Sequence, residues 1–469
     1  MKAMPYLQAQ GPIDWAQFVA TCWDRRPVVF RRHGAAPYPL DAALAAAASA
    51  ARTANGDEQA CRFVLDDRQR RQPGAWLPRQ EDATFERYAQ RILREGGGRS
   101  YALIVNEFHR HDRRIWEGGR RFFQGLFAQV GLPSTGAITT LFHGNYERTP
   151  VGVHKDRFAT FVFVLQGRKR MRFWPTRPWQ DAVATRVDYA EHLADSFAID
   201  VGPGDLLYWP AAYYHVGETL GVEVATSVNV GIPRDGHALL YDFDAIVRAA
   251  DAVDAQAAAA GDACGDDAGA ADQVAGALAT VRRLATPAAL RSAASAGYLA
   301  LRTGGGFVPP PPASPVAPLH AQGRWQLADP SFPLAWMHDG DSALCGAAGH
   351  VRRVEGFDDR AAALLRRFDS GAGVGVAELL APFAGTAPEA SATGVTLQQT
   401  QARALLEWLV STRALVPASA SASTRDGGAD AHAVSCRRSF VIRPPAHDRA
   451  MRSGMCKGVL ACNSAPLAS

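Results

Sequence analysis

Three residues with metal-binding side chains stand out by their spacing. His154 and Asp156 form an HxD motif, and His215 follows 59 residues after Asp156. Alternate residues of a β-strand point to the same side, so one strand would present His154 and Asp156 together. If a facing strand adds His215, two imidazoles and one carboxylate occupy one face of an octahedral ion and leave three positions open. That ligand set is typical of non-haem Fe(II) oxygenases, so we expect these three residues to be the metal ligands and the catalytic centre.

A simpler interpretation of the same residues is a hydrogen-bonded His154–Asp156 pair at a strand end, with His215 in an ordinary loop, because HxD tripeptides also arise by chance. A second cluster, His109 and His111, follows an apparent strand and precedes a charged stretch. We interpret it as a polar turn and not as another metal site.

The elements around the motif are short and rich in β-branched and aromatic residues. The predicted strands cover residues 136–142, 158–165, 170–174, 196–200, 205–209 and 222–231, with glycine and proline between them. Short strands at such intervals predict an antiparallel barrel or jelly roll. Before them the pattern predicts a short helix and strand in 13–32, helices at 82–94 and 115–130, and a strand at 101–106.

The rest of the chain is helical and divides into further units. Helices are expected at 237–258 and, after an Ala/Gly/Asp-rich stretch at 255–271, through residue 301, followed by a stiff Pro-rich connection at 304–318. Strands at 334–337 and 350–354 and helices at 359–369, 376–384 and 397–412 follow in an order similar to a winged-helix module. The predicted domains are 1–235 (oxygenase), 236–318 (helical segment and linker), 319–416 (winged-helix-like module) and 417–469 (a tail without periodicity).

Composition limits the classes of partner. The chain has 469 residues, 47% of them hydrophobic, and a net charge of +4. The tail from 417 onwards holds seven basic and three acidic residues, which account for that charge and leave a nearly neutral body. Nucleic acid is therefore not an expected partner. No stretch reaches the roughly 18 apolar residues of a membrane span, the N-terminus lacks a signal-peptide pattern, and the cysteines lack CxxC spacing, so we expect a cytoplasmic location.

Residues from about 137 to 234 resemble the JmjC and cupin-like 2-oxoglutarate oxygenases, through the HxD…H motif and the strands around it. The stretch at 23–30, WDRRPVVF, is similar to the start of such chains. The resemblance implies an α+β protein with a double-stranded β-helix (jelly-roll or cupin) core. The order of barrel, helical segment and small C-terminal module most resembles the bacterial ribosomal-oxygenase branch, in which the helical segment forms a homodimer.

The resemblance also implies residue roles. His154, Asp156 and His215 match the ligands of Fe(II). Lys169 matches the basic residue that pairs with the distal carboxylate of 2-oxoglutarate. Its role is also favoured because the chain uses only four lysines among its 50 basic residues. Asn229 lies where related enzymes place a polar residue near the cosubstrate or metal, and Thr160 has the strand parity of the ligands. Val151 departs from the family, since some members have threonine there.

We therefore expect a 2-oxoglutarate-dependent dioxygenase that uses Fe(II), 2-oxoglutarate and O₂ to hydroxylate a side chain in a protein or peptide. One variant is a hydroxylase of a ribosomally made peptide that the C-terminal module recruits. The alternative from another class is a non-catalytic cupin-like protein that binds a metal or small ligand. A third possibility is a small-molecule oxygenase.

Overall fold

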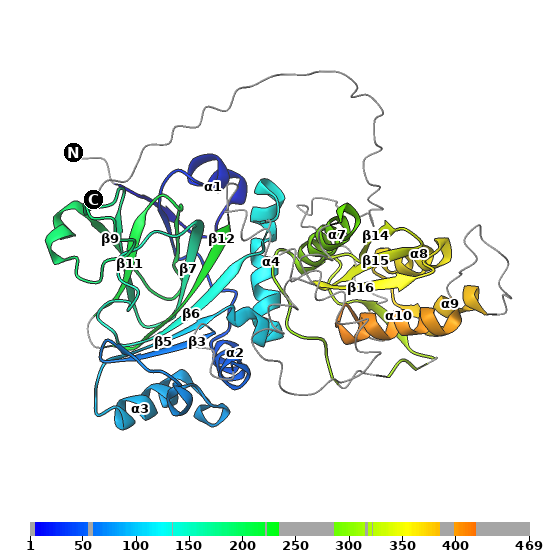
Figure 1. Ribbon diagram of the computed structural model, residues 1–469, viewed down its shortest axis with the longest axis horizontal. Helices are drawn as coiled ribbons and strands as arrows, with labels where there is room; N and C mark the ends of the chain where they lie inside the picture. Colours follow the sequence, from blue (N-terminus) through cyan, green and yellow to red (C-terminus); the bar gives the residue numbers. More distant parts are fainter. Residues whose placement is uncertain are drawn as a thin grey trace, which may run out of the picture.

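The computed structural model describes residues 5–54, 60–133, 135–220, 223–233, 286–314, 318–320, 322–384 and 398–418. The helix predicted at 237–258, the Ala/Gly/Asp-rich stretch and most of the predicted tail lie outside these residues. Figure 1 shows strands β5–β12 on one side, strands β14–β16 with helices α7–α10 on the other, and helix α4 between them. Among the described residues, no helix is both long and apolar enough to cross a membrane.

Two sheets face each other in the N-terminal part. The larger sheet has nine strands and is antiparallel except where β1 pairs with β2. Its order is β1 (Leu7–Gln10), β2 (Val28–Arg31), β10 (Leu206–Trp209), β7 (Phe158–Gln166), β12 (Ala225–Pro233), β6 (Ile138–Gly144), β5 (Tyr101–Asn106), β3 (Cys61–Leu65) and β4 (Arg68–Gln69). The smaller sheet is β11 (Tyr214–Thr219), β8 (Lys169–Trp174) and β9 (Phe197–Val201).

Side chains from both sheets meet in one apolar layer. Val162, Val164 and Trp209 of the larger sheet pack with Met171 and Phe173 of β8, and all five are almost fully buried. Neighbouring positions on β7, such as Phe161 and Phe163, point the other way, into the core beneath the helices. This alternation follows from the period of two along a strand. The antiparallel strands and mixed α+β content agree with the expected cupin-like core.

Helices cover the outer face of the larger sheet, and their ends follow local signals. They are α1 (Trp15–Thr21), α2 (Leu40–Thr53), α3 (Phe85–Glu95) and α4 (Arg113–Val130). Asp112 caps α4 by accepting from the backbone amides of Arg114 and Ile115, and Thr84 caps α3 in the same way. The sequence predicted α1, α3 and α4 but not α2, whose run of alanines has little periodicity.

A glycine in α4 allows the chain to pass close to the helix. A Cβ atom added to Gly118 would lie 1.9 Å from the carbonyl oxygen of Pro37. Helix propensity alone predicts that Gly118→Ala stabilises the protein by about 1 kcal/mol. We expect the opposite sign, a loss of about 1–2 kcal/mol, because the backbone at Pro37 must move away. Urea unfolding measures this change. Gln124→Ala, at an exposed position of the same helix, is the control, and a Gly118→Ala variant as stable as the parent would contradict the prediction.

The C-terminal part contains two three-stranded sheets and four helices in the described residues. One sheet is β14 (Ala335–Asp339), β15 (Ser342–Ala347) and β16 (His350–Glu355), and the other is β17 (Val374–Gly375), β13 (Arg324–Leu327) and β18 (Leu415–Pro417). The helices are α7 (Pro287–Gly304), α8 (Asp359–Arg366), α9 (Val376–Leu380) and α10 (Gln399–Ser411). The sequence predicted β14, β16 and these helices but missed β13, β15, β17 and β18. Of these, β15 is buried throughout and therefore has no alternating pattern.

The C-terminal part packs against α4. The guanidinium of Arg120 lies between the rings of Trp116 and Phe332, with its Cζ 3.9 Å and 4.1 Å from their centroids. Trp116 donates its indole N–H to the carbonyl of Phe307, and Arg113 donates to the carbonyl of Arg413. These contacts fix the C-terminal part on the side of α4 that faces away from the two sheets (Figure 1). The domain boundaries at 235, 318 and 416 stay predictions.

Candidate metal centre

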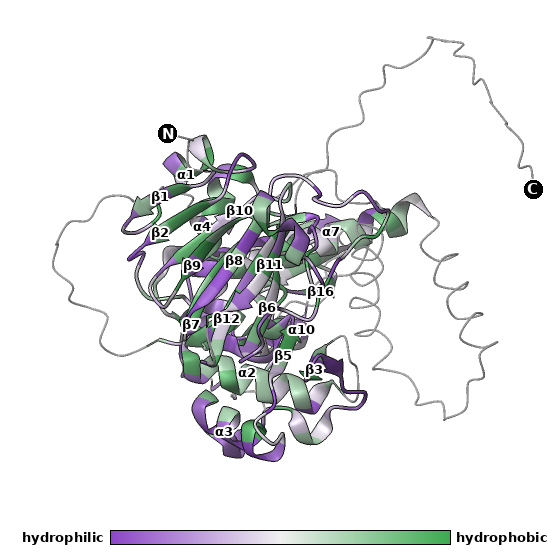
Figure 2. Cartoon of the chain, turned by 90° about the vertical axis from the view of Figure 1, so that its left-hand side faces the viewer, coloured by the Kyte–Doolittle hydropathy of each residue, from purple (hydrophilic) through white to green (hydrophobic). Residues whose placement is uncertain are grey.

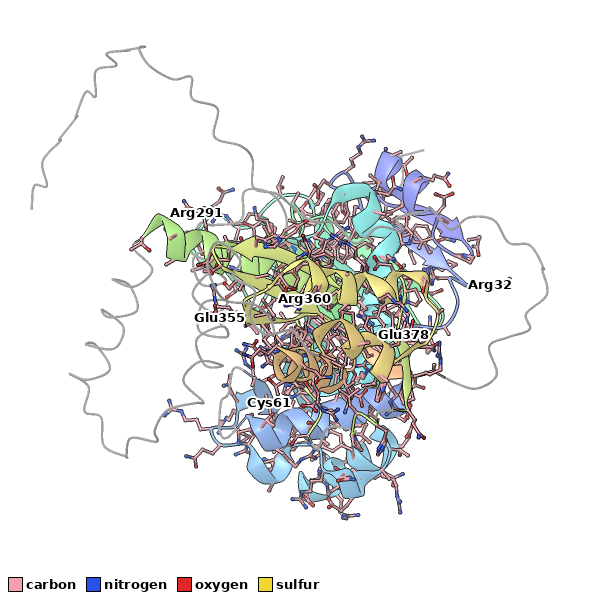
Figure 3. The ribbon with its side chains drawn as sticks, turned by 90° about the vertical axis from the view of Figure 1, so that its right-hand side faces the viewer. Arg32, Cys61, Arg291, Glu355, Arg360 and Glu378 are labelled. Carbon is pink, nitrogen blue, oxygen red and sulfur yellow. The ribbon has the colours of Figure 1, made fainter. Side chains whose placement is uncertain are left out.

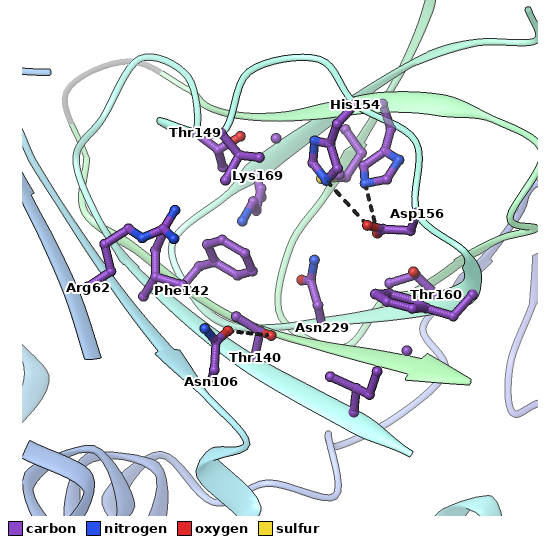
Figure 4. Close-up of a pocket in the computed structure, with 18 residues that line it drawn as sticks. Arg62, Asn106, Thr140, Phe142, Thr149, His154, Asp156, Thr160, Lys169 and Asn229 are labelled. Carbon is purple, nitrogen blue, oxygen red and sulfur yellow. Dashed lines mark hydrogen bonds and ion pairs between the residues drawn. The ribbon is translucent and has the colours of Figure 1, made fainter. Parts of the chain in front are cut away.

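The three candidate ligands converge at one point. The Nε2 atom of His154 lies 3.6 Å from Oδ1 of Asp156, and Nε2 of His215 lies 3.5 Å from Oδ2 of the same carboxylate. The two imidazole centroids are 4.5 Å apart. One ligand atom from each residue lies within 4.8 Å of the others, and the described residues form no other group of three or more histidine, cysteine or acidic residues of this kind. Figure 4 shows the ring of His154 turned toward Asp156.

Backbone pairing brings the two histidines together. His154 and His215 exchange hydrogen bonds between their amides and carbonyls, with N–O distances of 3.1 Å and 2.8 Å. His215 is the second residue of β11, a strand that the sequence did not predict, and it faces His154 as expected of a second strand. The prediction that His154 and Asp156 share a strand is wrong. The pairing of His154 is an isolated bridge, and the chain leaves it before Asp156 and enters β7 at Phe158.

Contacts with backbone carbonyl oxygens fix which nitrogen of each histidine is available to a metal. The Nδ1 atom of His154 lies 2.9 Å from the carbonyl oxygen of Gly152, and Nδ1 of His215 lies 3.4 Å from that of Tyr213. A carbonyl can only accept, so each Nδ1 carries the proton and each Nε2 keeps a lone pair toward Asp156. Burial lowers the pKa of His215, which favours the neutral ligand form, and burial raises the pKa of Asp156. The donor set therefore fits a divalent cation.

Lys169 is the buried cation beside this centre. Residues 169, 171 and 173 of β8 point inward, whereas Arg170 and Arg172 point outward and pair with Asp200 and Glu218. Hydrophilic colour marks this strand in Figure 2. Lys169 is 1% exposed, and its Nζ donates to Tyr146 Oη at 3.1 Å and Ser227 Oγ at 2.9 Å. The strand parity and the burial show that Lys169 is not a solvated strand residue.

The surroundings of Lys169 are suited to an anion. Its Nζ lies 4.4 Å from the centroid of Phe142, and burial lowers its pKa to about 7. Burial also raises the pKa of Tyr146, so that hydroxyl stays protonated and can donate. A buried ammonium of this kind gains most from a charged partner. The arrangement fits the carboxylate of a cosubstrate.

Thr160 and Asn229 line the same cavity as the metal ligands and Lys169. The hydroxyl of Thr160 and the amide oxygen of Asn229 are buried and have no hydrogen-bond partner among the residues that the structure describes. Buried polar atoms are nearly always satisfied in folded proteins, so these two are free to bind a ligand or water. The structure thus brings together all six residues singled out in the sequence, and their roles stay predictions.

Sequence reasoning missed the opposite wall of the cavity. This wall is formed by Asn106 of β5, Thr140 and Phe142 of β6, and Arg62 of β3. Thr140 is the register partner of both Asn229 and Asn106, which places three polar residues in a row across β12, β6 and β5. No spacing in the sequence indicates this row, because the strands are joined by connections of very different length.

His109 differs from its predicted place in a polar turn. It is buried, its Nδ1 lies 2.6 Å from Thr139 Oγ1, and its ring packs edge-on against Phe307. Burial lowers its pKa to about 3. His109 is therefore a neutral core residue, and His111 does not join it in a metal-binding group of the described residues.

Comparison with known proteins identifies the domain. Residues 132–237 match the model of the JmjC domain family, a range that holds the three ligands and Lys169. The chain contains a JmjC domain. It is a 2-oxoglutarate-dependent dioxygenase, with Fe(II) and 2-oxoglutarate as the cofactors that this family uses, and the donor set described above fits both.

Solved structures similar to this chain include the Escherichia coli ribosomal oxygenase YcfD. One structure of it is 14% identical, with a TM-score of 0.42, and the match covers 87% of this chain and 98% of that chain. Another holds cobalt and 2-oxoglutarate and is 14% identical, with a TM-score of 0.41 and coverage of 86% and 98%. Similarity this low says nothing about the substrate of the present JmjC protein. No curated protein sequence matches the chain.

Proposed function

We propose that this JmjC protein hydroxylates a side chain in a protein or peptide, and that it belongs to the ribosomal-oxygenase branch. The observation that carries the proposal is the position of His154, Asp156 and His215 beside a buried lysine in one cavity. Bound Fe(II) and 2-oxoglutarate would supply the oxidising chemistry, with O₂ as the second cosubstrate and succinate and CO₂ as products. His154, Asp156 and His215 would hold the metal by Nε2, a carboxylate oxygen and Nε2.

The remaining residues of the cavity would bind and orient the reactants. Lys169, held by Tyr146 and Ser227, would neutralise the distal carboxylate of 2-oxoglutarate. The Thr160 hydroxyl would donate or accept and the Asn229 amide oxygen would accept, since neither has a partner among the described residues. The apolar layer around Val162, Phe173 and Trp209 would exclude water, which strengthens these charge interactions. Correct placement of a target C–H bond is then the main contribution of the protein.

The C-terminal module supports a macromolecular substrate. We propose that it is a winged-helix-like recognition element, because β14–β16 are followed by α8, α9 and α10 in the expected order. It lies across α4 from the two sheets, so a substrate that contacts both would have to extend around the domain. Figure 3 shows Glu355, Arg360 and Glu378 on its surface, and such mixed charge favours a peptide over nucleic acid. A variant of this proposal is the hydroxylation of a ribosomally made peptide, which would use the same site and module.

We also propose that the predicted helical segment would supply a homodimer contact.

The test is capture of the substrate. The Asp156→Ala variant, loaded with 2-oxoglutarate, is expected to retain proteins or peptides that the active enzyme then converts to products 16 Da heavier, as seen by mass spectrometry. Omission of 2-oxoglutarate is the control. Succinate formed without any modified peptide, or modification only of free amino acids, would contradict the macromolecular substrate. Lack of succinate with every substrate would instead favour the non-catalytic cupin-like alternative.

A further inference from the structure

Arg62 is a cation in the cavity wall for which the catalytic scheme has no use. It lies on β3, its side chain lines the same cavity as the metal ligands, and Figure 4 shows it across the cavity from His154 and Asp156. Its Nε atom is buried and forms no hydrogen bond with any described residue. In the described part of the chain no carboxylate pairs with it, whereas most arginines of the two sheets, such as Arg31, Arg170 and Arg172, have one.

The register of the larger sheet separates Arg62 from Lys169. Arg62 pairs with Ile104, Ile104 with Phe142, and Phe142 with Ser227, the residue that binds Lys169. Three strand spacings therefore separate the backbone of Arg62 from that of Ser227, or about 14 Å. Lys169 reaches the cavity from β8 of the smaller sheet, and Arg62 reaches it from near the edge of the larger one. Lys169 and Arg62 therefore lie at two separate positions in one cavity.

The charges of the cavity leave Arg62 unbalanced. Of the described residues that line it, only Asp156 carries a carboxylate, and that group belongs to the metal site. The positive charges of a divalent metal and of Lys169 cancel the negative charges of Asp156 and of the 2-oxoglutarate dianion. The guanidinium of Arg62 then remains as one positive charge next to the place where the substrate must lie. A cationic target side chain would be repelled there, and an acidic one would be attracted.

We propose that Arg62 determines substrate specificity by binding a carboxylate of the substrate, so that the hydroxylated residue or its neighbour is aspartate or glutamate. The inference rests on the proposed function and deepens it. The guanidinium can give two parallel N–H donors to one carboxylate, which fixes orientation as well as charge. Asn106 and Thr140, hydrogen-bonded to each other at 3.2 Å, lie on the adjacent strands and offer polar contacts between Arg62 and the metal site.

Arg62 could instead bind the cosubstrate, since 2-oxoglutarate also has two carboxylates. The position of Lys169 argues against 2-oxoglutarate as the partner of Arg62. Lys169, Tyr146 and Ser227 already form one complete site for a carboxylate on the other side of Phe142. The experiment must nevertheless measure both ligands separately.

The probe is an array of random nonapeptides, each made in three versions, with Asp or Glu, with the isosteric Asn or Gln, and with Lys at the same positions. Binding is measured with Fe(II) under nitrogen, so that no turnover occurs, and with and without 2-oxoglutarate. The parent protein should bind the acidic versions about 10- to 100-fold better than the amide versions. Arg62→Gln should abolish this difference, and Arg62→Glu should transfer the preference to the lysine versions.

The controls separate the two sources of carboxylate. Arg68→Gln changes an exposed arginine of β4 and should behave as the parent. The dissociation constant of 2-oxoglutarate, measured by calorimetry without peptide, should be the same for Arg62→Gln and the parent. A weaker 2-oxoglutarate affinity in Arg62→Gln would assign Arg62 to the cosubstrate and overturn the proposal, as would equal binding of acidic and amide peptides by the parent. Failure of the parent to bind 2-oxoglutarate would contradict the proposed function, while the acidic preference measured without it still tests Arg62.

Discussion

Asp156→Ala is expected to abolish 2-oxoglutarate-dependent succinate formation by this JmjC protein. Both histidine Nε2 atoms face this carboxylate, at 3.6 Å and 3.5 Å, so its removal takes away the anionic ligand and the group that closes the cluster. Loss of residues that merely orient a metal ligand costs 10–100-fold in similar sites, so loss of the ligand should exceed about 100-fold. Succinate measurement with Fe(II), ascorbate and O₂ gives the rate, and calorimetry with Mn(II) gives the metal affinity.

The fold should survive this change. Burial raises the pKa of the Asp156 carboxyl, which indicates that its charge is costly inside the protein. The thermal midpoint without metal should therefore not fall. Asp188→Ala, at an exposed carboxylate of the β8–β9 connection, serves as the matched control and should keep full activity. If the Asp156→Ala variant still forms succinate at the parent rate, Asp156 is not a ligand of the catalytic metal.

Lys169→Met is expected to weaken the binding of 2-oxoglutarate by about 100-fold or more. The substitution keeps the length of the side chain but removes the only charge that Tyr146 and Ser227 hold in place. Removing one member of a buried charge pair costs about 2–5 kcal/mol, largely because the other charge is left unpaired. Calorimetric titration of 2-oxoglutarate measures the effect. Arg168→Gln changes the exposed neighbour on the same turn and should bind as the parent does.

The affinity of the parent for 2-oxoglutarate should also fall at alkaline pH. Burial lowers the pKa of Lys169 from 10.5 to about 7, so above pH 7 the lysine is mostly neutral before the ligand binds. A carboxylate binds the protonated form, and binding must then take up one proton. The dissociation constant should rise about tenfold per pH unit above 7. Calorimetry in two buffers of different ionisation enthalpy counts this proton. A flat profile between pH 7 and 9 would show that Lys169 stays charged without its ligand.

The stability of the ligand-free protein should also depend on Lys169. It should change with pH in the opposite direction to the affinity for 2-oxoglutarate. Because the folded pKa of Lys169 is below that of the unfolded chain, the unfolded state binds more protons between pH 7 and 10.5. The contribution of Lys169 to the free energy of unfolding therefore rises with pH through this window. Lys169→Met removes this contribution and should not destabilise the ligand-free protein at pH 7, so a loss of 2-oxoglutarate affinity in that variant is not a loss of folding.

The sequence by itself predicted the three candidate metal ligands and determined the class of chemistry. His154, Asp156 and His215 are identified by residue type and order, which do not depend on how the intervening chain folds. Most strands of the two sheets were also predicted, because their alternation and their Gly/Pro boundaries are local. Lys169 was found by its place in the motif, and the parity of β8 explains why it points inward between two outward arginines.

Only the tertiary structure decided which other residues meet at the site. The bridge between His154 and His215 and the row from Asn229 through Thr140 to Asn106 depend on pairing between strands far apart in the chain. Such register is set by the burial of whole faces and not by any local pattern. The same holds for Arg62, one of many arginines in the sequence. Its place in the cavity, and the lack of a described hydrogen-bond partner for its Nε, arise only once β3 has joined the sheet beside β5.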